Sequence, residues 1–116
     1  MRQPPILDVR FFVTEAGTEP VHDWLRTLSA SDRKVIGEDV KTVQFGWPLG
    51  MPLVDHLGSD IWEVRSKLER RIARTLFATE GSTMILLHGF IKKQQKTPKP
   101  DLDLAKDRLK LLRRRT

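Results

Sequence analysis

Basic side chains are concentrated in two stretches of the sequence, and cations are the side chains that bind phosphate groups. Residues 1–91 carry 11 basic and 12 acidic side chains, whereas residues 92–116 carry ten basic and three acidic ones. Such asymmetry is typical of proteins that bind polyanions, and the alternative is a solvated basic face with a charged tail. The second basic stretch lies upstream, where only Glu69 opposes Arg65, Lys67, Arg70, Arg71 and Arg74.

The positions of these residues along predicted strands place several of them on one side of a sheet. Arg65 and Lys67 are two residues apart in one predicted strand. His88 and Lys92 are likewise in phase in another, and Arg74 lies in the strand between. Because burying unpaired cations costs too much free energy, we expect these side chains to line one uncovered sheet face where phosphates can bind.

The composition narrows the chemistry that such a face can perform. The chain has no cysteine and no tyrosine, which excludes a disulfide framework, a thiolate zinc site and a thiol or phenol nucleophile. No acidic pair or histidine cluster accompanies the cations, so we expect neither a metal nor a cofactor. Cleavage of RNA by its own 2′-hydroxyl stays open, since the protein must only position the strand, stabilise developing charge and move protons. The alternatives are nucleic-acid binding without catalysis and, for His88, a strand histidine that is merely hydrogen-bonded.

The elements that must position these residues follow from hydrophobic periodicity. Alternating apolar residues predict strands, and apolar residues three and four apart predict helices. A Gly- and Pro-rich stretch before residue 61 predicts a long loop. The order β-α-α-β-β-β-α predicts an α+β fold in which helices cover one face of a small, mainly antiparallel sheet. The predicted elements are a strand over residues 6–13, a helical hairpin over residues 18–46, strands over residues 61–68, 71–78 and 84–93, and a final helix from residue 101.

Local signals refine these boundaries and the class of protein. Thr18, Ser29 and Asp101 precede the predicted helices, and their side chains are suited to cap the free N–H groups there. The length of 116 residues suits one domain, residues 1–116. No apolar run is long enough to cross a membrane and no secretory signal is recognisable, so we expect a cytoplasmic protein.

Two stretches, IWEVRSKLERRIARTLF and MILLHGFIKKQQKTPKPDLDLAKDRL, resemble the HigB-like, phage-derived branch of the RelE/ParE toxin superfamily of type II toxin–antitoxin systems. The predicted order of elements matches as well, so the resemblance spans nearly the whole chain. It implies a RelE-like fold and a metal-independent, ribosome-dependent mRNA endoribonuclease that inhibits translation. The implied partners are the ribosome, mRNA and a cognate helix-turn-helix antitoxin of the HigA-like kind.

The resemblance also implies roles for individual residues. Arg74 matches an arginine that holds the scissile phosphate. RelE carries a C-terminal tyrosine that this chain lacks, and that role is open to Lys96, Lys99 or His88. Glu63 stands where RelE has a lysine, and it is expected to pair with Arg65 or to act as a base. The candidate catalytic residues are Arg65, Arg74, His88, Lys93 and Lys96. The candidate RNA-binding residues are Lys67, Arg71, Lys92, Lys99, Arg113, Arg114 and Arg115.

Two rival functions share these features. A ParE-like inhibitor of DNA gyrase would have the same fold but would bind a protein, and a nonenzymatic protein would bind RNA without cutting it. For the antitoxin, we expect docking either on the Leu-rich face of the last helix or on the helical hairpin.

Overall fold

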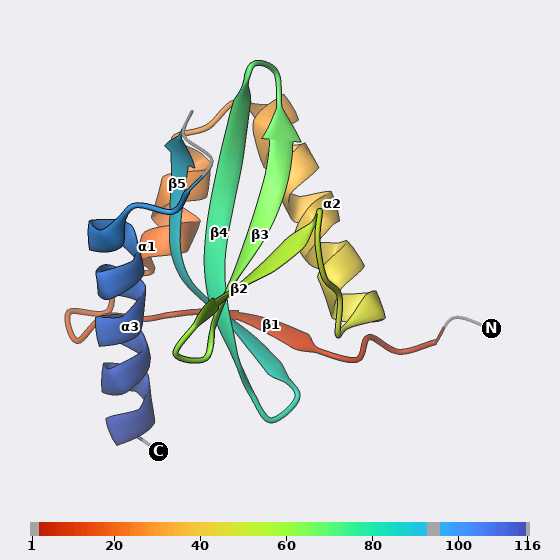
Figure 1. Ribbon diagram of the computed structural model, residues 1–116. Helices are drawn as coiled ribbons and strands as arrows, with labels where there is room; N and C mark the ends of the chain where they lie inside the picture. The colour runs from red at the N-terminus through yellow and green to blue at the C-terminus, as the bar shows by residue number, and fades with distance from the viewer. Residues whose placement is uncertain (1–2, 93–95, 116) are drawn as a thin grey trace.

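A five-stranded sheet forms the centre of the molecule, with strand order β1-β5-β4-β3-β2 (Figure 1). The computed structural model describes residues 3–92 and 96–115. Strands β3, β4 and β5 form the predicted antiparallel meander, and β1 pairs in parallel with β5. The α+β fold is therefore confirmed and is consistent with a RelE-like architecture. The elements are β1 (Asp8–Phe11), α1 (Pro20–Arg26), α2 (Ala30–Gly46), β2 (Val54–Gly58), β3 (Ile61–Leu68), β4 (Arg71–Glu80), β5 (Thr83–Lys92) and α3 (Lys99–Arg114).

Strand β2 was not predicted, and the expectation of an irregular loop is wrong for residues 54–58. This strand pairs antiparallel with β3, with Val54 opposite Val64. Both valines are fully buried, so cross-strand packing stabilises a segment whose own composition is turn-like. The order of elements is therefore β-α-α-β-β-β-β-α.

Helices α1 and α2 cover one face of the sheet. Their buried residues, such as Val21 and Val43, pack in one core with Val64 and Phe77 of the sheet. Ser29 caps α2 as predicted, because its hydroxyl accepts a hydrogen bond from the backbone N–H of residue 32. The expected cap at Thr18 is wrong, since the N-cap of α1 is residue 19.

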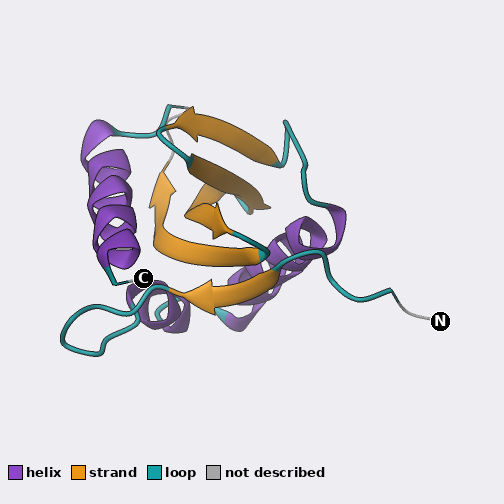
Figure 2. Cartoon of the chain, turned by 90° about the horizontal axis from the view of Figure 1, so that it is seen from below, coloured by secondary structure: helices purple, strands orange, loops and turns teal. Residues whose placement is uncertain are grey.

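Helix α3 covers part of the opposite face, so the expectation that helices lie on one face only is wrong. Ala105 and Leu109 of α3 pack against Leu76 and Leu87 of the sheet. In Figure 2, α3 runs along one side of the curved sheet and α2 along another. Burying this apolar stripe removes it from water and fixes α3 along the sheet.

The two ends of α3 are held by polar contacts. At the C-terminal end, Arg113 donates hydrogen bonds to Glu80 (2.7 Å) and Asp60 (3.1 Å). At the N-terminal end, α3 begins at Lys99 with residue 98 as N-cap, so the expected cap at Asp101 is wrong. Within the described part of the chain, no helix is both long and apolar enough to cross a membrane.

Candidate functional site

The sheet face that α3 covers continues past the start of that helix, and there it carries charged side chains. The register places Arg65 of β3 opposite Arg74 of β4. In the neighbouring row, Glu63 lies opposite Leu76, which lies opposite His88 of β5. Because residues directly opposite one another share a face, strand parity correctly predicts that Arg65, Arg74 and His88 lie on one side.

Arg74 is not on an open surface, and that expectation is wrong. The side chains of Arg74 and Glu63 are both 0% exposed, with 3.6 Å between Nη1 and Oε1. Thr97 links them, because its hydroxyl accepts from Arg74 Nη1 (3.2 Å) and donates to Glu63 Oε1 (2.5 Å). A guanidinium is stable in such a buried place only when it is paired, so Arg74 holds Glu63 and Thr97 instead of facing solvent.

Arg65 is the charged member of this group that reaches solvent. Its Nε lies 3.3 Å from Glu63 Oε2, and its side chain is 20% exposed. The predicted pairing of Glu63 with Arg65 is confirmed. We call Glu63, Arg65, Arg74 and Thr97 the Glu63 cluster. Two guanidinium groups share one carboxylate in this cluster, which leaves it with one net positive charge and favours an anion beside Arg65.

His88 is held by a carboxylate at the beginning of α3. Its Nε2 lies 2.7 Å from Asp101 Oδ1, and its ring stacks on Phe90 with centroids 5.4 Å apart. Both side chains of the pair are partly exposed. A carboxylate on one imidazole nitrogen orients the ring, as in other sites where histidine moves protons. Asp101 therefore serves His88, a role that the sequence did not indicate.

The C-terminal lysines differ in what they can contribute. Lys96 is exposed immediately before Thr97. Lys99 donates a hydrogen bond to Asp103 (2.9 Å), which raises the pKa of the Lys99 ammonium above its ordinary value. A raised pKa keeps Lys99 charged, so it is suited to bind phosphate and not to accept a proton. Lys92 ends β5, and Lys93 lies outside the described residues.

The remaining predicted RNA-binding arginines are not brought to the Glu63 cluster. Arg71 pairs with Asp32 of α2 (2.7 Å), on the side of the sheet that α2 covers. Its strand position, opposite Leu68, directs it to the other face from Arg65 and Arg74. The arginines at the end of α3 lie at the opposite end of that helix from residue 97 (Figure 1). Arg115 donates to the backbone oxygen of residue 13 (2.6 Å), and Arg114 is exposed.

One acidic residue of this face was missed because its strand was missed. Asp55 of β2 lies directly opposite Glu63, on the same face. Its side chain is partly buried, and it has no hydrogen bond or ion pair with another described residue. A partly buried carboxylate without such a partner can accept a proton, or a hydrogen bond from a ligand. Among the described residues, no three His, Cys, Asp or Glu side chains are grouped so that they could hold a metal ion.

Comparison with known families places this arrangement in context. A sequence model of the family described as "Phage derived protein Gp49-like (DUF891)" matches residues 23–110. The matched range includes four of the five strands and every member of the Glu63 cluster. No curated protein matches the chain significantly.

Proposed function

Because the chain belongs to the phage-derived Gp49-like family, a family of RelE/HigB-like toxins of toxin–antitoxin systems, we propose that it is a HigB-like mRNA endoribonuclease. It cuts mRNA on the ribosome and so inhibits translation until a cognate antitoxin binds it. The cut strand supplies its own nucleophile, the 2′-hydroxyl, so the protein needs no metal in this scheme.

The observation that supports the proposal best is the position of Arg65. Its guanidinium is partly exposed at the edge of the positively charged Glu63 cluster, and Glu63 fixes it on one side. Lys67, exposed two residues along the same strand, adds a second cation on the same face. A partly exposed guanidinium can bind phosphate oxygens and stabilise the charge that develops on them during cleavage.

Proton transfer requires groups of a second kind. In the reaction, the 2′-oxygen loses its proton and bonds to phosphorus, while the 5′-oxygen leaves and takes up a proton. His88 is our candidate for this transfer, because Asp101 orients its ring and the pair is partly exposed. Lys96 is the second candidate, and Lys92, Lys93 and Lys99 would hold the strand electrostatically.

The partners follow from this activity. A toxin of this kind meets ribosomes and mRNA in the cytoplasm, and a HigA-like helix-turn-helix antitoxin neutralises it. Of the two docking surfaces expected from the sequence, the apolar face of α3 is used against the sheet. We propose the helical hairpin α1–α2 as the antitoxin surface, because Phe45 near the end of α2 is exposed.

One observation favours the nonenzymatic alternative. The burial of Arg74 leaves the described sheet face with fewer solvent-facing arginines than a phosphate clamp predicted from the sequence would have. Under that alternative the protein binds RNA and leaves it intact.

A translation extract distinguishes these functions. The purified protein is added to extracts programmed with a reporter mRNA, with and without ribosomes, and cleavage is mapped by primer extension. We expect cuts within the coding region only when ribosomes engage the message. Intact message with measurable RNA binding would favour the nonenzymatic alternative, and inhibition of DNA supercoiling in a parallel gyrase assay would favour the ParE-like one.

A further inference from the structure

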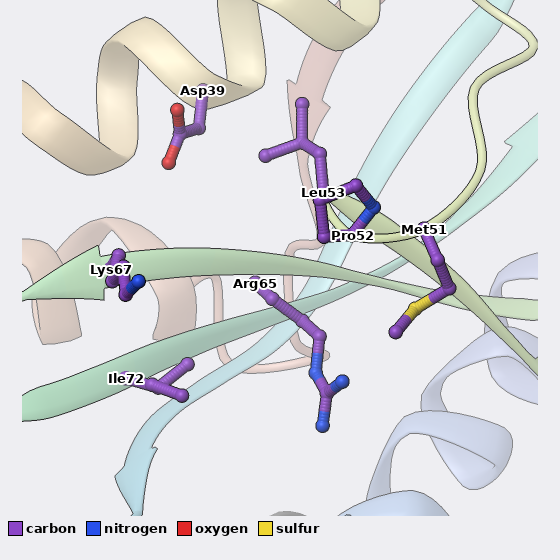
Figure 3. A pocket seen from close by; sticks show the side chains of 7 residues that line it. All are labelled: Asp39, Met51, Pro52, Leu53, Arg65, Lys67 and Ile72. Carbon is purple, nitrogen blue, oxygen red and sulfur yellow. The ribbon is translucent and has the colours of Figure 1, made fainter.

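A cleft opens beside the Glu63 cluster, between α2 and the edge of the sheet. Its volume is about 500 Å³, within the range of roughly 300–1,000 Å³ that is typical of small-ligand sites. The segment before β2, the strands β3 and β4, and the helix α2 all contribute walls (Figure 3). The lining residues are Asp39, Met51, Pro52, Leu53, Arg65, Lys67 and Ile72.

The cleft is lined by both aliphatic and positively charged side chains. Met51, Pro52, Leu53 and Ile72 are aliphatic, and Met51 is 59% exposed although it is large and apolar. Two cations of the proposed RNA face, Arg65 and Lys67, also line it. A cleft with aliphatic walls and cations beside it suits a heterocycle that carries a phosphate, because the ring is buried against the walls and the phosphate pairs with the cations.

Asp39 gives the cleft a directional polar group. In Figure 3 its carboxylate projects from α2 toward β3, whereas the Arg65 guanidinium extends away from α2. Asp39 is only partly exposed and has no hydrogen bond or ion pair with another described residue. A carboxylate only accepts hydrogen bonds, so its natural partner in the cleft is a ligand edge rich in N–H donors.

We propose that the cleft binds a guanine nucleotide, with the base between the aliphatic walls, its N1–H and N2–H groups donating to Asp39, and its phosphate on Arg65 or Lys67. This inference rests on the proposed function, because it takes the nucleotide to be part of the RNA strand at Arg65. Two adjacent donors match the two oxygens of a carboxylate. On the edge that would face Asp39, adenine and cytosine carry only one donor group, an amino group. Uracil has a single N–H there, and the carbonyl oxygens on either side of it are repelled by the Asp39 carboxylate.

The test is a nucleotide titration followed by NMR. The methyl signals of Met51, Leu53 and Ile72 are monitored while 5′-GMP, AMP, CMP or UMP is added to the full chain. We expect saturable shifts with GMP at a Kd at least five-fold lower than that for UMP. A tetranucleotide RNA containing one guanine is the second arm: tighter binding than GMP identifies an RNA residue as the occupant, and equal binding identifies a free nucleotide.

Two variants test the role of Asp39. Asp39→Asn keeps the shape of the side chain but removes its charge, and it should reduce the preference for GMP over UMP to less than two-fold. Glu38→Gln changes the neighbouring carboxylate, which lines a different cleft, and should leave the preference unchanged.

Unmoved methyl signals while mRNA cleavage persists would overturn the cleft proposal alone. Equal shifts with all four nucleotides would overturn base selection. An effect of Asp39→Asn on antitoxin binding alone would assign the cleft to a protein partner. GMP binding without any mRNA cleavage would overturn the proposed function instead.

Discussion

The sheet face under α3 is divided into two halves that are built by opposite rules. In one half, Leu76 and Leu87 are buried against Ala105 and Leu109 of α3, and the packed side chains are apolar. The other half lies beyond the first residue of α3, where Arg74 is two residues from Leu76 on β4 and Glu63 and Arg65 lie beside them on β3. The apolar half is stabilised by removing surface from water, whereas the charged half is stable only because each buried charge has a partner.

The difference shows how one sheet can hold charge at a defined place. Glu63 and Arg74 are as completely buried as the leucines, so their positions are fixed by packing. Arg65 shares Glu63 and is the charged group of the cluster that is partly exposed to solvent. The charged half therefore consists of an inner pair, Glu63 and Arg74, that supports the fold and an outer, partly exposed cation, Arg65, and variants can separate the two.

The largest expected effect is that of Arg74→Ala. It leaves Glu63 buried with one of its two guanidinium partners removed, which should lower the free energy of unfolding by about 4 kcal/mol. Chemical denaturation of the purified variant measures this. The double variant Glu63→Leu with Arg74→Met, which removes both buried charges, should recover most of the loss. An unchanged unfolding curve for Arg74→Ala would show that the inner pair does not support the fold.

Leu109→Ala makes the matching change in the apolar half. Leu109 is 3% exposed, and its truncation should cost about 3 kcal/mol through lost burial and the cavity left beneath α3. The exposed Leu104 on the same helix is the control, because Leu104→Ala should cost less than about 1 kcal/mol. Equal losses for the two variants would mean that α3 is not held through this stripe.

Thr97→Val tests the link between the inner pair and the segment that leads into α3. The valine keeps the shape but removes the hydroxyl that joins Arg74 to Glu63, so we expect a loss of about 1 kcal/mol. Thr42→Val on the exposed side of α2 is the control, with a change within about 0.5 kcal/mol. A loss at Thr97 no larger than at Thr42 would argue against the bridging role of the hydroxyl.

The smallest expected effect concerns Lys67, whose exposed ammonium should contact phosphate without fixing the strand. Lys67→Ala should weaken RNA binding at all sequences and reduce the slope of log K against log salt by about 1. Arg114→Ala, an exposed cation at the far end of α3, should leave the slope unchanged. Equal changes for the two variants would show that binding follows total charge and not the face near Arg65.

A structural feature can be predicted from the sequence when the residues that determine it are close together in the chain. Strand parity is local, so it places Arg65, Arg74 and His88 on one face correctly. The burial of Arg74 depends on Thr97, which is 23 residues away in the segment that follows β5 in the chain. No local pattern marks that contact, and the same holds for the pairing of His88 with Asp101.

The missed strand β2 has the same explanation. Its five residues include Gly58 and Asp55, which are rare in strands, and the segment is extended because Val54 packs beside Val64 of β3. The long-range partner outweighs the local preference. Two features of the charged half, Asp55 and the cleft before β2, could therefore not be predicted.

The central claim is that Arg65 acts on RNA while Arg74 supports the fold, and one paired measurement on Arg65→Ala tests it most directly. The variant is melted thermally and then assayed for mRNA cleavage in a translation extract, with Arg71→Ala as the control from the opposite side of the sheet. We expect the melting temperature of Arg65→Ala to stay within about 4 °C of the unmodified protein, equivalent to at most 1 kcal/mol, while cleavage falls at least 100-fold. Cleavage at the unmodified rate by a folded Arg65→Ala protein, or an equal loss in Arg71→Ala, would contradict the claim.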